Sequence, residues 1–461
     1  MTIDPRTPEW RPQLAAGEAP VYARIVERLA ADIDDGALSV GARLPTQRAL
    51  AERLGVGLGT VTRAYAEAEA RGLIQAVVGR GSFVAAHALA PAPAGSLDLG
   101  RNVPPFGPAR AALRQTFAAI ARRADLSERL DYAPADGFEA DRRAGALWLR
   151  RAANFASADA GRLICCAGAQ QAVAVALGAL CRPGEALIVE EATFHGVSLA
   201  AAHAGLRLVP AGMDGEGLTP EALERAAADS EARAAYVLPF QNPTARVMSL
   251  SRRHAIIEVA RRRGLTLIED DLYGPHVADL GLPPLAQLAP DQVAYVSGLS
   301  KSLAPGLRAG FLIPPDHARP AALEALRAVA FGPPTFGALV ATQWIESGEA
   351  FEILEATREE LTRRTDLARA MLAGLIEPIL RRESPHLWAP LSELEAERVA
   401  GQALRAGVEL TRPRAPYVTG APVKGLRICL GGAPDLAALE RGLAVVKQAL
   451  TFAPVVGEAV V

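Results

Sequence analysis

The stretch "SGLSKSLAPGLRAG", residues 297–310, places a lysine between two serines in a segment that glycine and proline interrupt. Lysine is otherwise almost absent, because only Lys301, Lys424 and Lys447 among the 49 basic residues are lysines. Unlike arginine, lysine can lose its proton near neutral pH and attack a carbonyl carbon to form an imine. We therefore interpret Lys301 as an imine-forming residue rather than a generic surface charge.

Apolar strands alternate with amphipathic helices around this stretch. The strand-like segments are "ALIVEE" (186–191), "AAYVLPF" (234–240), "LTLIEDD" (265–271) and "VAYVSG" (293–298). This alternation predicts an α/β domain with a mostly parallel sheet, whose ligand site lies at the carboxyl ends of the strands. Polar residues at these ends, including Asn242, Asp270 and Lys301, should therefore converge.

An imine-forming lysine fits pyridoxal 5′-phosphate (PLP), which supplies an aldehyde, an electron-withdrawing pyridine ring and a phosphate. The ring nitrogen needs a carboxylate to keep it protonated, and Asp270 can supply one. We read its neighbours Glu269 and Asp271 as bystanders. Asn242 and Tyr273 fit as hydrogen-bond donors to the phenolic oxygen.

The phosphate, the ring face and a bound carboxylate need other groups. "AGAQQAVAVALGAL", residues 167–180, predicts a strand-to-helix turn whose N–H groups suit a phosphate, and Arg308 follows the lysine by seven positions. Phe194 in "ATFHG" can stack on the ring. Arg427 in "GLRICLGG" is available for a substrate carboxylate.

The front of the chain predicts a separate DNA-reading module. Helical stripes run through residues 21–33, a short helix follows Thr46, and a third helix is expected from about Thr60. "LIQAVVGRGSFVA" then predicts two short strands. Three helices and a hairpin make a winged helix-turn-helix, whose third helix enters the major groove of DNA.

Sequence composition indicates how the chain is divided into domains and where in the cell it is located. "AAHALAPAPAGS" (85–96) predicts a linker. No secretory signal precedes it, and the longest apolar run, 172–181, is too short to cross a bilayer. Four cysteines without a CxxC or Cys/His pairing indicate neither a metal site nor a disulfide framework. We expect a cytoplasmic protein without membrane contact. The expected boundaries are 12–86 for the winged helix, 87–97 for the linker, 98–345 for a large PLP-binding domain and 346–453 for a small C-terminal α+β subdomain.

The run "GARLPTQRALAERLGVGLGTVTRAYAEAEARGLIQAVVGRGSFVA", residues 41–85, resembles the winged-helix domain of GntR-type bacterial regulators along its whole length. The resemblance implies DNA-facing roles for Arg43, Thr46, Arg48, Thr60, Arg63 and Arg80. Relatives often carry Ser-Arg at the start of the recognition helix, where this chain has Gly57-Leu58-Gly59. Affinity for DNA per module should therefore be modest, and dimerisation onto two half-sites would compensate.

The motifs "GAQQA", "TFHG", "QNPT", "EDDLYG", "SKSLAPGLRAG" and "LRIC" occur in this order, and they resemble those of fold-type I PLP aminotransferases over residues 100–453. The resemblance implies a Schiff-base role for Lys301. It assigns the pyridine nitrogen to Asp270, the phenolic oxygen to Asn242 and Tyr273, and stacking to Phe194. It assigns the phosphate to Ala169, Gln170, Ser300 and Arg308, and a ligand carboxylate to Arg427 together with Asn242.

Two further features belong to this resemblance. Tyr132 in "DYAPADG" resembles the tyrosine that reaches the phosphate of the partner subunit, which implies a homodimer. The chain departs from the family pattern at Ala192, where proline is common, at Ala245, where glycine is usual, and at Gly298, where a serine often stands. None of these departures removes a chemically required group.

A GntR-type domain joined to an aminotransferase-like domain is similar to the MocR subfamily of regulators. The resemblance implies a PLP-dependent transcriptional regulator that binds operator DNA and senses an amine or amino-acid effector by imine exchange at Lys301. In a variant of this mechanism PLP itself is the signal. The alternative is a working PLP-dependent aminotransferase that carries a DNA-binding domain.

Overall fold

The computed structural model describes residues 10–14, 20–34, 38, 42–70, 73–77, 81–84, 96–379 and 381–452. The chain divides into two compact units, residues 1–93 and 94–461, and each is considered by itself. Of the linker expected at 87–97, only residues 96 and 97 are described. No helix within the described ranges is both long and apolar enough to cross a bilayer.

The N-terminal unit contains three helices and a hairpin. They are α1 Val21–Asp34, α2 Gln47–Leu54, α3 Leu58–Ala70, β1 Ile74–Val77 and β2 Gly81–Val84. The Thr46 side chain caps α2 by accepting from the Ala49 N–H at 3.3 Å. Leu50, Val61 and Tyr65 are buried in one core with residues of α1. The predicted winged helix-turn-helix is confirmed, although α3 begins at Leu58 rather than near Thr60.

The C-terminal unit is built on a seven-stranded sheet in the order β4-β12-β11-β10-β9-β5-β6. Its strands are β4 Ile164–Ala167, β5 Ala186–Glu190, β6 Arg207–Ala211, β9 Ala234–Val237, β10 Thr266–Asp270, β11 Val293–Gly298 and β12 Ala309–Ile313. Only β12 runs antiparallel to its neighbours. The predicted α/β domain with a mostly parallel sheet is confirmed.

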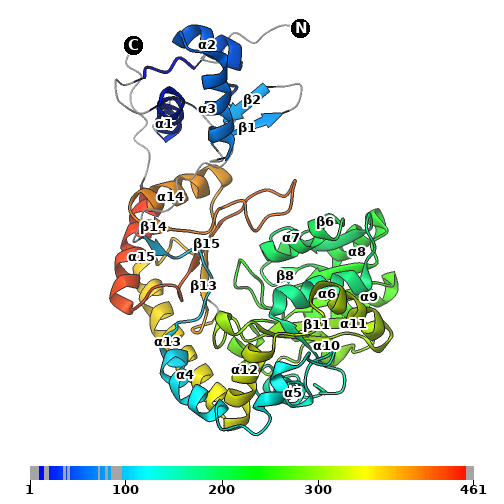
Figure 1. The fold of residues 1–461 in the computed structure, drawn as a ribbon. Coiled ribbons are helices and arrows are strands. Elements are labelled where there is room, and N and C mark those ends of the chain that lie inside the picture. The colour runs from blue at the N-terminus through cyan, green and yellow to red at the C-terminus, as the bar shows by residue number, and fades with distance from the viewer. Residues whose placement is uncertain are drawn as a thin grey trace. The chain divides into compact units, whose positions relative to one another are not determined.

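Helices cover both faces of this sheet (Figure 1). Successive side chains of a strand point to opposite faces, so Leu267 joins one core and Ile268 the other. The first core includes residues of α5 Glu139–Ala152, α8 Pro220–Ser230, α9 Leu250–Arg263 and α12 Thr335–Ser347. The second includes residues of α6 Ala169–Leu180, α7 His195–His203 and α11 Arg319–Ala330. Burial on both faces explains why the strands are apolar throughout.

A smaller lobe has its own core, which contains Leu99, Trp388 and Leu443. Its elements are β13 His386–Ala389, α14 Glu393–Arg405, β14 Val408–Glu409, β15 Leu426–Cys429 and α15 Leu436–Thr451. β3 Leu97–Asp98 pairs with β14, so the start of this unit belongs to the small lobe. α13 Glu349–Met371 contributes Ile353 to the first core and Ala368 to the third, and it thereby connects the lobes (Figure 1).

The remaining elements complete the unit. They are α4 Gly107–Ile120, α10 Leu285–Leu288, the hairpin β7 Met213–Asp214 and β8 Gly217–Leu218, and the 3₁₀ turns η1 Leu126–Leu130, η2 Gly274–His276, η3 Ala278–Leu280, η4 Pro305–Leu307 and η5 Asp316–Ala318.

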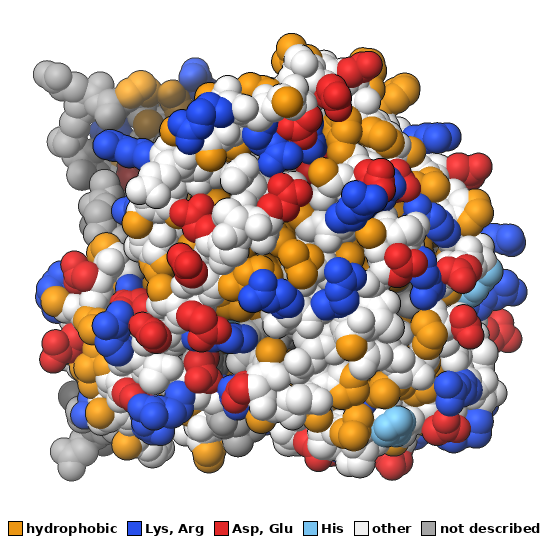
Figure 2. All heavy atoms as spheres, turned by 90° about the horizontal axis from the view of Figure 1, so that it is seen from below, with side chains coloured by type: hydrophobic (Ala, Val, Ile, Leu, Met, Phe, Trp, Pro, Cys, Tyr) orange, Lys and Arg blue, Asp and Glu red, His pale blue; other side chains and the backbone are white. Residues whose placement is uncertain are grey.

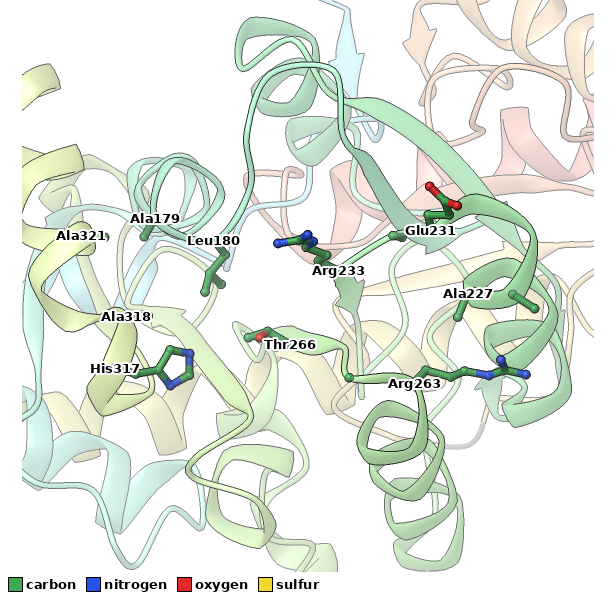
Figure 3. A pocket seen from close by; sticks show the side chains of 13 residues that line it. Ala179, Leu180, Ala227, Glu231, Arg233, Arg263, Thr266, His317, Ala318 and Ala321 are labelled. Carbon is green, nitrogen blue, oxygen red and sulfur yellow. The ribbon is translucent and has the colours of Figure 1, made fainter.

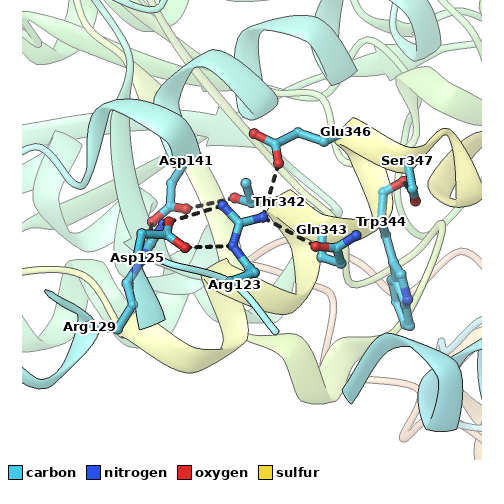
Figure 4. Close-up of polar contacts among 9 residues, drawn as sticks. All are labelled: Arg123, Asp125, Arg129, Asp141, Thr342, Gln343, Trp344, Glu346 and Ser347. Atoms are coloured by element: carbon cyan, nitrogen blue, oxygen red, sulfur yellow. Dashed lines mark hydrogen bonds and ion pairs between the residues drawn. The ribbon is translucent and has the colours of Figure 1, made fainter. Parts of the chain in front are cut away.

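A buried ion pair ties η1 to α5 and α12. Arg129 Nη1 donates to Asp141 Oδ2 at 2.6 Å, and both side chains are almost fully buried. The Thr342 hydroxyl donates to the other carboxylate oxygen at 2.7 Å. Beside it, Arg123 lies between Asp125 and Glu346 (Figure 4). The buried pair is hydrogen-bonded at both carboxylate oxygens, as a buried charge requires.

Candidate functional site

The carboxyl ends of the parallel strands bring the predicted polar residues to one edge of the sheet. Asp270 is the last residue of β10, and Lys301 follows β11 by three positions. Asn242 follows β9, and Glu190 ends β5. Asn242, Asp270 and Glu190 are buried. The carboxyl ends of these strands therefore carry buried polar side chains, although the strands themselves are apolar.

Lys301 is half-buried, and its amine is held by the backbone. Nζ donates to the carbonyl oxygen of Asn102 at 2.7 Å. Burial, followed by the nearby Arg427 guanidinium, lowers the pKa of Lys301 to about 8. A substantial fraction of this amine is therefore neutral, and so nucleophilic, near physiological pH.

Asp270 is the acid that faces Lys301. Its Oδ2 accepts a hydrogen bond from the Tyr236 hydroxyl, and its Oδ1 accepts the Leu272 N–H at 3.3 Å. Burial raises the pKa of Asp270 to about 6, and the Tyr236 hydrogen bond opposes this rise. The carboxylate is thus ionised at neutral pH and can balance a positive charge beside it.

The two neighbouring acids have other partners. Glu269 accepts the N–H groups of Leu285 and Ala286, at 2.8 and 2.9 Å, at the start of α10. Asp271 accepts from the Tyr295 hydroxyl at 2.9 Å. Glu269 and Asp271 point to one face of the strand and Asp270 to the other, as alternation requires. These contacts agree with reading Glu269 and Asp271 as bystanders.

Arg427 reaches from the small lobe to the large one. Nη1 donates to Asn242 Oδ1 at 2.7 Å, Nη2 to the Gly100 carbonyl at 3.0 Å, and Nε to the Thr411 hydroxyl at 3.3 Å. Arg427 and Asn242 are therefore in direct contact, as their shared predicted role requires.

The start of α6 forms a backbone turn next to Arg308. Gly168 precedes the helix with φ 80°, and no side chain caps α6. A Cβ on Gly168 would lie 2.8 Å from Arg308 Nη2, so glycine is needed both for the conformation and for the space. Arg308 itself has φ 50° and donates to the Ala167 carbonyl at 2.8 Å. Ala169 and Gln170 begin α6, and buried Ser300 precedes Lys301.

Phe194 packs close to this turn. It precedes α7 and is half-buried. Gln170 Nε2 donates to the Gly196 carbonyl at 2.8 Å, which joins α6 to α7 beside the Phe194 ring. The ring therefore lies near the residues predicted to hold phosphate.

Two departures from the family pattern have a local structural consequence. A Cβ on Gly298 would approach the Ala309 carbonyl oxygen at 2.9 Å, so this backbone has no room for a serine without a shift. Ala245 has φ 60°, a left-handed conformation that glycine adopts without strain and alanine does not.

Tyr132 does not join this cluster within the chain. Its side chain is 85% exposed, and its ring lies 6.1 Å from that of Phe331. Its predicted role belongs to the partner subunit's site and stays a prediction.

The predicted DNA-facing residues lie mainly on the surface of the N-terminal unit. Arg43, Thr46, Arg48 and Arg63 are exposed and Thr60 is half-buried, whereas Arg80 lies outside the described residues. The Arg63 guanidinium lies 4.0 Å from the Tyr22 ring centroid, and it donates to the Tyr22 hydroxyl at 3.3 Å. Arg63 must leave Tyr22 before it can reach a base.

Sequence reasoning missed several residues at this edge. Asn102 contacts Lys301, Tyr273 and His386, and Tyr236 bonds to Asp270. Glu190 is buried, and burial raises its pKa well above the usual range. Glu190 was expected at this edge as a polar residue at a strand end, although no role was assigned to it. Asn102 and His386 lie outside the motifs, so only tertiary structure reveals them.

A cavity of about 730 Å³ lies at the opposite, amino ends of β9 and β10. α6, α8 and α9 end beside it, and Arg233 and Arg263 line it with His317. Figure 3 shows Arg233 pointing toward Leu180 while Arg263 extends away. Of these three basic residues only Arg263 lies at the C-terminus of an α-helix, α9, where its charge offsets the helix dipole. The described residues contain no cluster of His, Cys, Asp and Glu that could hold a metal ion.

Comparisons with known proteins agree with this geometry. Residues 94–446 match the family of class I and II aminotransferases, and residues 21–84 match the gntR family of bacterial regulatory proteins. An uncharacterised HTH-type transcriptional regulator of Bacillus subtilis, YdeF, is 28% identical over 457 residues, which cover 96% of each chain. A 2-aminoadipate transaminase of Thermus thermophilus is 27% identical over 304 residues, covering 62% of this chain and 73% of that protein.

Solved structures share the fold of the C-terminal unit. The alpha-aminoadipate aminotransferase LysN of Thermus thermophilus superposes with a TM-score of 0.68 at 23% identity, over 77% of this chain and 92% of that chain. An archaeal alanine:glyoxylate aminotransferase gives a TM-score of 0.68 at 20% identity, over 77% and 90%.

Proposed function

Because this chain belongs to the class I and II aminotransferase family and carries a GntR-type helix-turn-helix domain, we propose that it is a PLP-dependent transcriptional regulator. Its aminotransferase-like unit senses an amine or amino acid at Lys301, and its N-terminal unit binds operator DNA. The observation that carries this proposal is the half-buried Lys301 amine, of lowered pKa, near the buried Asp270 carboxylate. The relatives named as transcriptional regulators support the regulatory role.

The residues at the site fit PLP. Lys301 would hold the aldehyde carbon, Asp270 the ring nitrogen, and Tyr273 with Asn242 the phenolic oxygen. The uncapped start of α6 offers N–H groups that have no partner within the helix, which suits a phosphate near Arg308. When bound, PLP supplies a carbonyl that exchanges one amine for another and a ring that withdraws electrons.

The ionisation states support this fit. With its pKa of about 6, Asp270 is negative at pH 7 and can keep a ring nitrogen protonated. With its pKa of about 8, Lys301 gives up its proton far more readily than an exposed lysine. The Asp270 carboxylate can therefore balance a positive charge, while the Lys301 amine can act as a nucleophile.

Arg427 retains donors for a ligand carboxylate. A guanidinium carries five N–H groups, and three of them are used by Asn242, Gly100 and Thr411. One N–H remains on each terminal nitrogen, which is the pair that binds a carboxylate through two hydrogen bonds. An amino acid would therefore have its amine at Lys301 and its carboxylate at Arg427.

This arrangement gives a physical route from ligand to signal. Arg427 lies on β15 of the small lobe, whereas Asn242 follows β9 of the large lobe. A ligand that contacts both Arg427 and Asn242 would favour one arrangement of the two lobes over another. Such a ligand shifts the protein's conformational equilibrium by the difference between its affinities for the two states. PLP loading alone would act in the same way in the variant where PLP is the signal.

A homodimer is part of the proposal. Several exposed apolar side chains gather around α4, η1 and the start of α12, namely Leu113, Phe117, Leu130, Phe331 and Phe336. An apolar groove of about 430 Å³ lies between α4 and α12. The exposed Tyr132 ring lies 6.1 Å from that of Phe331, so a second copy seated there would receive the tyrosine that the family resemblance assigns to its phosphate. Sedimentation should give twice the chain mass, and a strict monomer would contradict this.

DNA binding is assigned to the N-terminal unit alone. On the face of the molecule drawn in Figure 2, acidic and basic side chains are interspersed and no broad area of one sign appears. The net charge of −2 agrees with this mixture. Such a surface offers no concentrated positive charge for phosphates, whereas Arg43 and Arg48 lie exposed in the unit that matches the gntR family.

A working aminotransferase remains the second candidate. It is favoured by Lys301, Asp270, Tyr273 and Arg427 all being present at one edge of the sheet. Turnover of amino donors with a 2-oxo acid separates the two: a transaminase regenerates its resting absorbance through many cycles, whereas a sensor stops after binding.

Borohydride reduction of the PLP-loaded protein tests the proposed site. With only three lysines, peptide mapping can assign the adduct without ambiguity. The adduct should lie on Lys301, be absent from Lys301→Ala, and persist in the control Lys447→Ala, whose residue is exposed. An adduct that survives in Lys301→Ala would overturn the assignment.

A further inference from the structure

Asn102 joins three groups that come from distant parts of the chain. Its Nδ2 donates to the Tyr273 hydroxyl at 2.9 Å and lies 2.8 Å from His386 Nδ1. Its carbonyl oxygen accepts from Lys301 Nζ at 2.7 Å. The Asn102, Tyr273 and His386 side chains are all buried. One residue thus contacts both groups proposed to meet the aldehyde end of PLP.

The amide orientation follows from counting donors. As placed, both N–H groups of Asn102 have acceptors, and Oδ1 is left without a partner among the described residues. The reversed amide would leave two buried N–H groups unpaired, which is rarer in proteins than an unpaired oxygen. His386 accepts through Nδ1, so it is neutral and carries its proton on Nε2, which has no acceptor among the described residues. The amide as placed therefore leaves one buried N–H unpaired, against two for the reversed amide. Burial, which lowers the pKa of His386 well below its ordinary value, agrees with this state.

The Tyr273 hydroxyl is an acceptor in this network, so its own proton remains available. The Tyr273 ring is fixed by Phe240 and His386, at centroid distances of 5.1 and 5.7 Å. Resting on the function proposed above, we propose that Asn102, held by His386, is a positioning residue that turns the Tyr273 proton toward the phenolic oxygen of PLP.

This orientation has a measurable consequence. A hydrogen bond donated to the phenolic oxygen withdraws negative charge from it, so that oxygen holds the proton of the adjacent Lys301 nitrogen less strongly. Loss of the Tyr273 donor therefore raises the pKa of that nitrogen. Among the described residues, the other charged or titratable groups near Tyr273 include Arg427 and Cys429 on β15, Asp270 on β10, Tyr236 on β9, and His276 on η2, whose ring lies 6.5 Å from that of Tyr273. None of them is changed in the test.

The test compares Asn102→Ala with Asn102→Asp in the full-length PLP-loaded protein. The visible absorbance of bound PLP is followed against pH. Alanine frees the tyrosine proton and should raise the pKa by roughly half to one unit, the size of one hydrogen bond. Aspartate has the shape of asparagine but only accepts, so it captures the tyrosine proton and should raise the pKa further.

If Asn102 only filled space, the pKa in Asn102→Asp would be close to that of wild type and the pKa in Asn102→Ala would be the most altered. That order would overturn the proposal. Tyr273→Phe supplies the second arm. In the Tyr273→Phe background, Asn102→Ala should cause no further shift of this pKa. Asn102→Asp should raise the pKa only through the negative charge of the aspartate. An Asn102→Ala shift that is unchanged in Tyr273→Phe would also contradict the proposal.

His386→Phe provides a variant that leaves Asn102 in place. It removes the acceptor behind the amide, and the pKa should rise by less than in Asn102→Ala, again only while Tyr273 is present. A wild-type protein that takes up no PLP at Lys301 would overturn the proposed function together with this inference. Normal PLP uptake with the wrong order of pKa values would overturn the inference alone.

Discussion

The lysine that stands out in the sequence also has the chemical state that its proposed role requires. Burial and the neighbouring Arg427 guanidinium lower the pKa of Lys301 to about 8. Only the neutral amine attacks an aldehyde. The rate of PLP capture by the cofactor-free protein should therefore rise about tenfold per pH unit below 8 and level off above it. Stopped-flow absorbance measures this rate, and a rise that continues to pH 10 would contradict the lowered pKa.

Asp270 offers a second test at the level of one residue. Asp270→Ala removes the charge proposed to pair with the ring nitrogen of PLP, and a hydrogen bond to a charged group contributes roughly 1.5–3 kcal/mol. The dissociation constant of PLP should rise about 10- to 100-fold, while the adduct on Lys301 still forms. Absorbance titration of the cofactor-free protein gives this constant. Affinity and absorbance equal to those of wild type would exclude the role.

Residues within sequence motifs could be predicted, and residues outside them could not. Asp270 could be chosen from three adjacent acids because the resemblance of "EDDLYG" to the aminotransferase motif assigns the ring nitrogen to it, and this role stays a prediction. Asn102 and His386 are 284 positions apart and meet only in the folded chain, where β3, just before Asn102, pairs with β14 and His386 lies on β13 of the same lobe. Local patterns carry no information about such a contact.

At the scale of elements, the buried pair Arg129–Asp141 fixes η1 and α12 against α5. Asp141→Ala would remove the hydrogen-bonded carboxylate from buried Arg129 and leave it only Asp125, at 3.7 Å. Breaking a buried pair typically costs about 3–5 kcal/mol. The exposed pair Arg143–Glu139 on the same helix is the control, because its side chains are 71% and 64% exposed. Arg143→Ala should change stability by less than about 1 kcal/mol. Equal urea midpoints for the two variants would contradict this account.

The recognition helix gives a second prediction at this scale. α3 begins at Leu58, which is 44% exposed and lies between two glycines, so the helix start presents no cation. Leu58→Arg should tighten DNA binding and steepen the dependence of log affinity on log salt by about 0.9 for one added phosphate contact. Fluorescence anisotropy at several salt concentrations measures both. An unchanged salt slope would mean that this end of α3 does not approach the DNA.

Helices and strands could be predicted where one hydrophobic pattern dominates a segment of the sequence. The four strand segments quoted from the sequence contain β5, β9, β10 and β11, because burial on both sides makes them continuously apolar. The third helix was expected near Thr60 but begins at Leu58, since Gly57 and Leu58 carry no capping signal that marks a start. The two-residue strands β3 and β14 are too short to leave a pattern.

At the scale of the whole molecule, the account couples a ligand site in one unit to DNA binding by another. Coupling between two sites is typically worth 1–3 kcal/mol, or about 5- to 150-fold in affinity. The order of motifs predicts that both units exist in one chain. It does not predict the strength of their coupling, because that depends on the difference between two conformations rather than on one set of contacts.

The central claim is tested most directly by the affinity of the PLP-loaded protein for a genomic DNA fragment that it retains. This affinity is measured with and without a panel of amines and amino acids, for wild type, Lys301→Ala and Arg427→Ala. At least one compound should change the wild-type affinity several-fold. The change should vanish in Lys301→Ala and, for amino acids, in Arg427→Ala, whose affinity without effector should equal that of wild type. If no compound alters the wild-type affinity, and the PLP-free and PLP-loaded forms bind DNA equally, the site does not control DNA binding and the account is wrong.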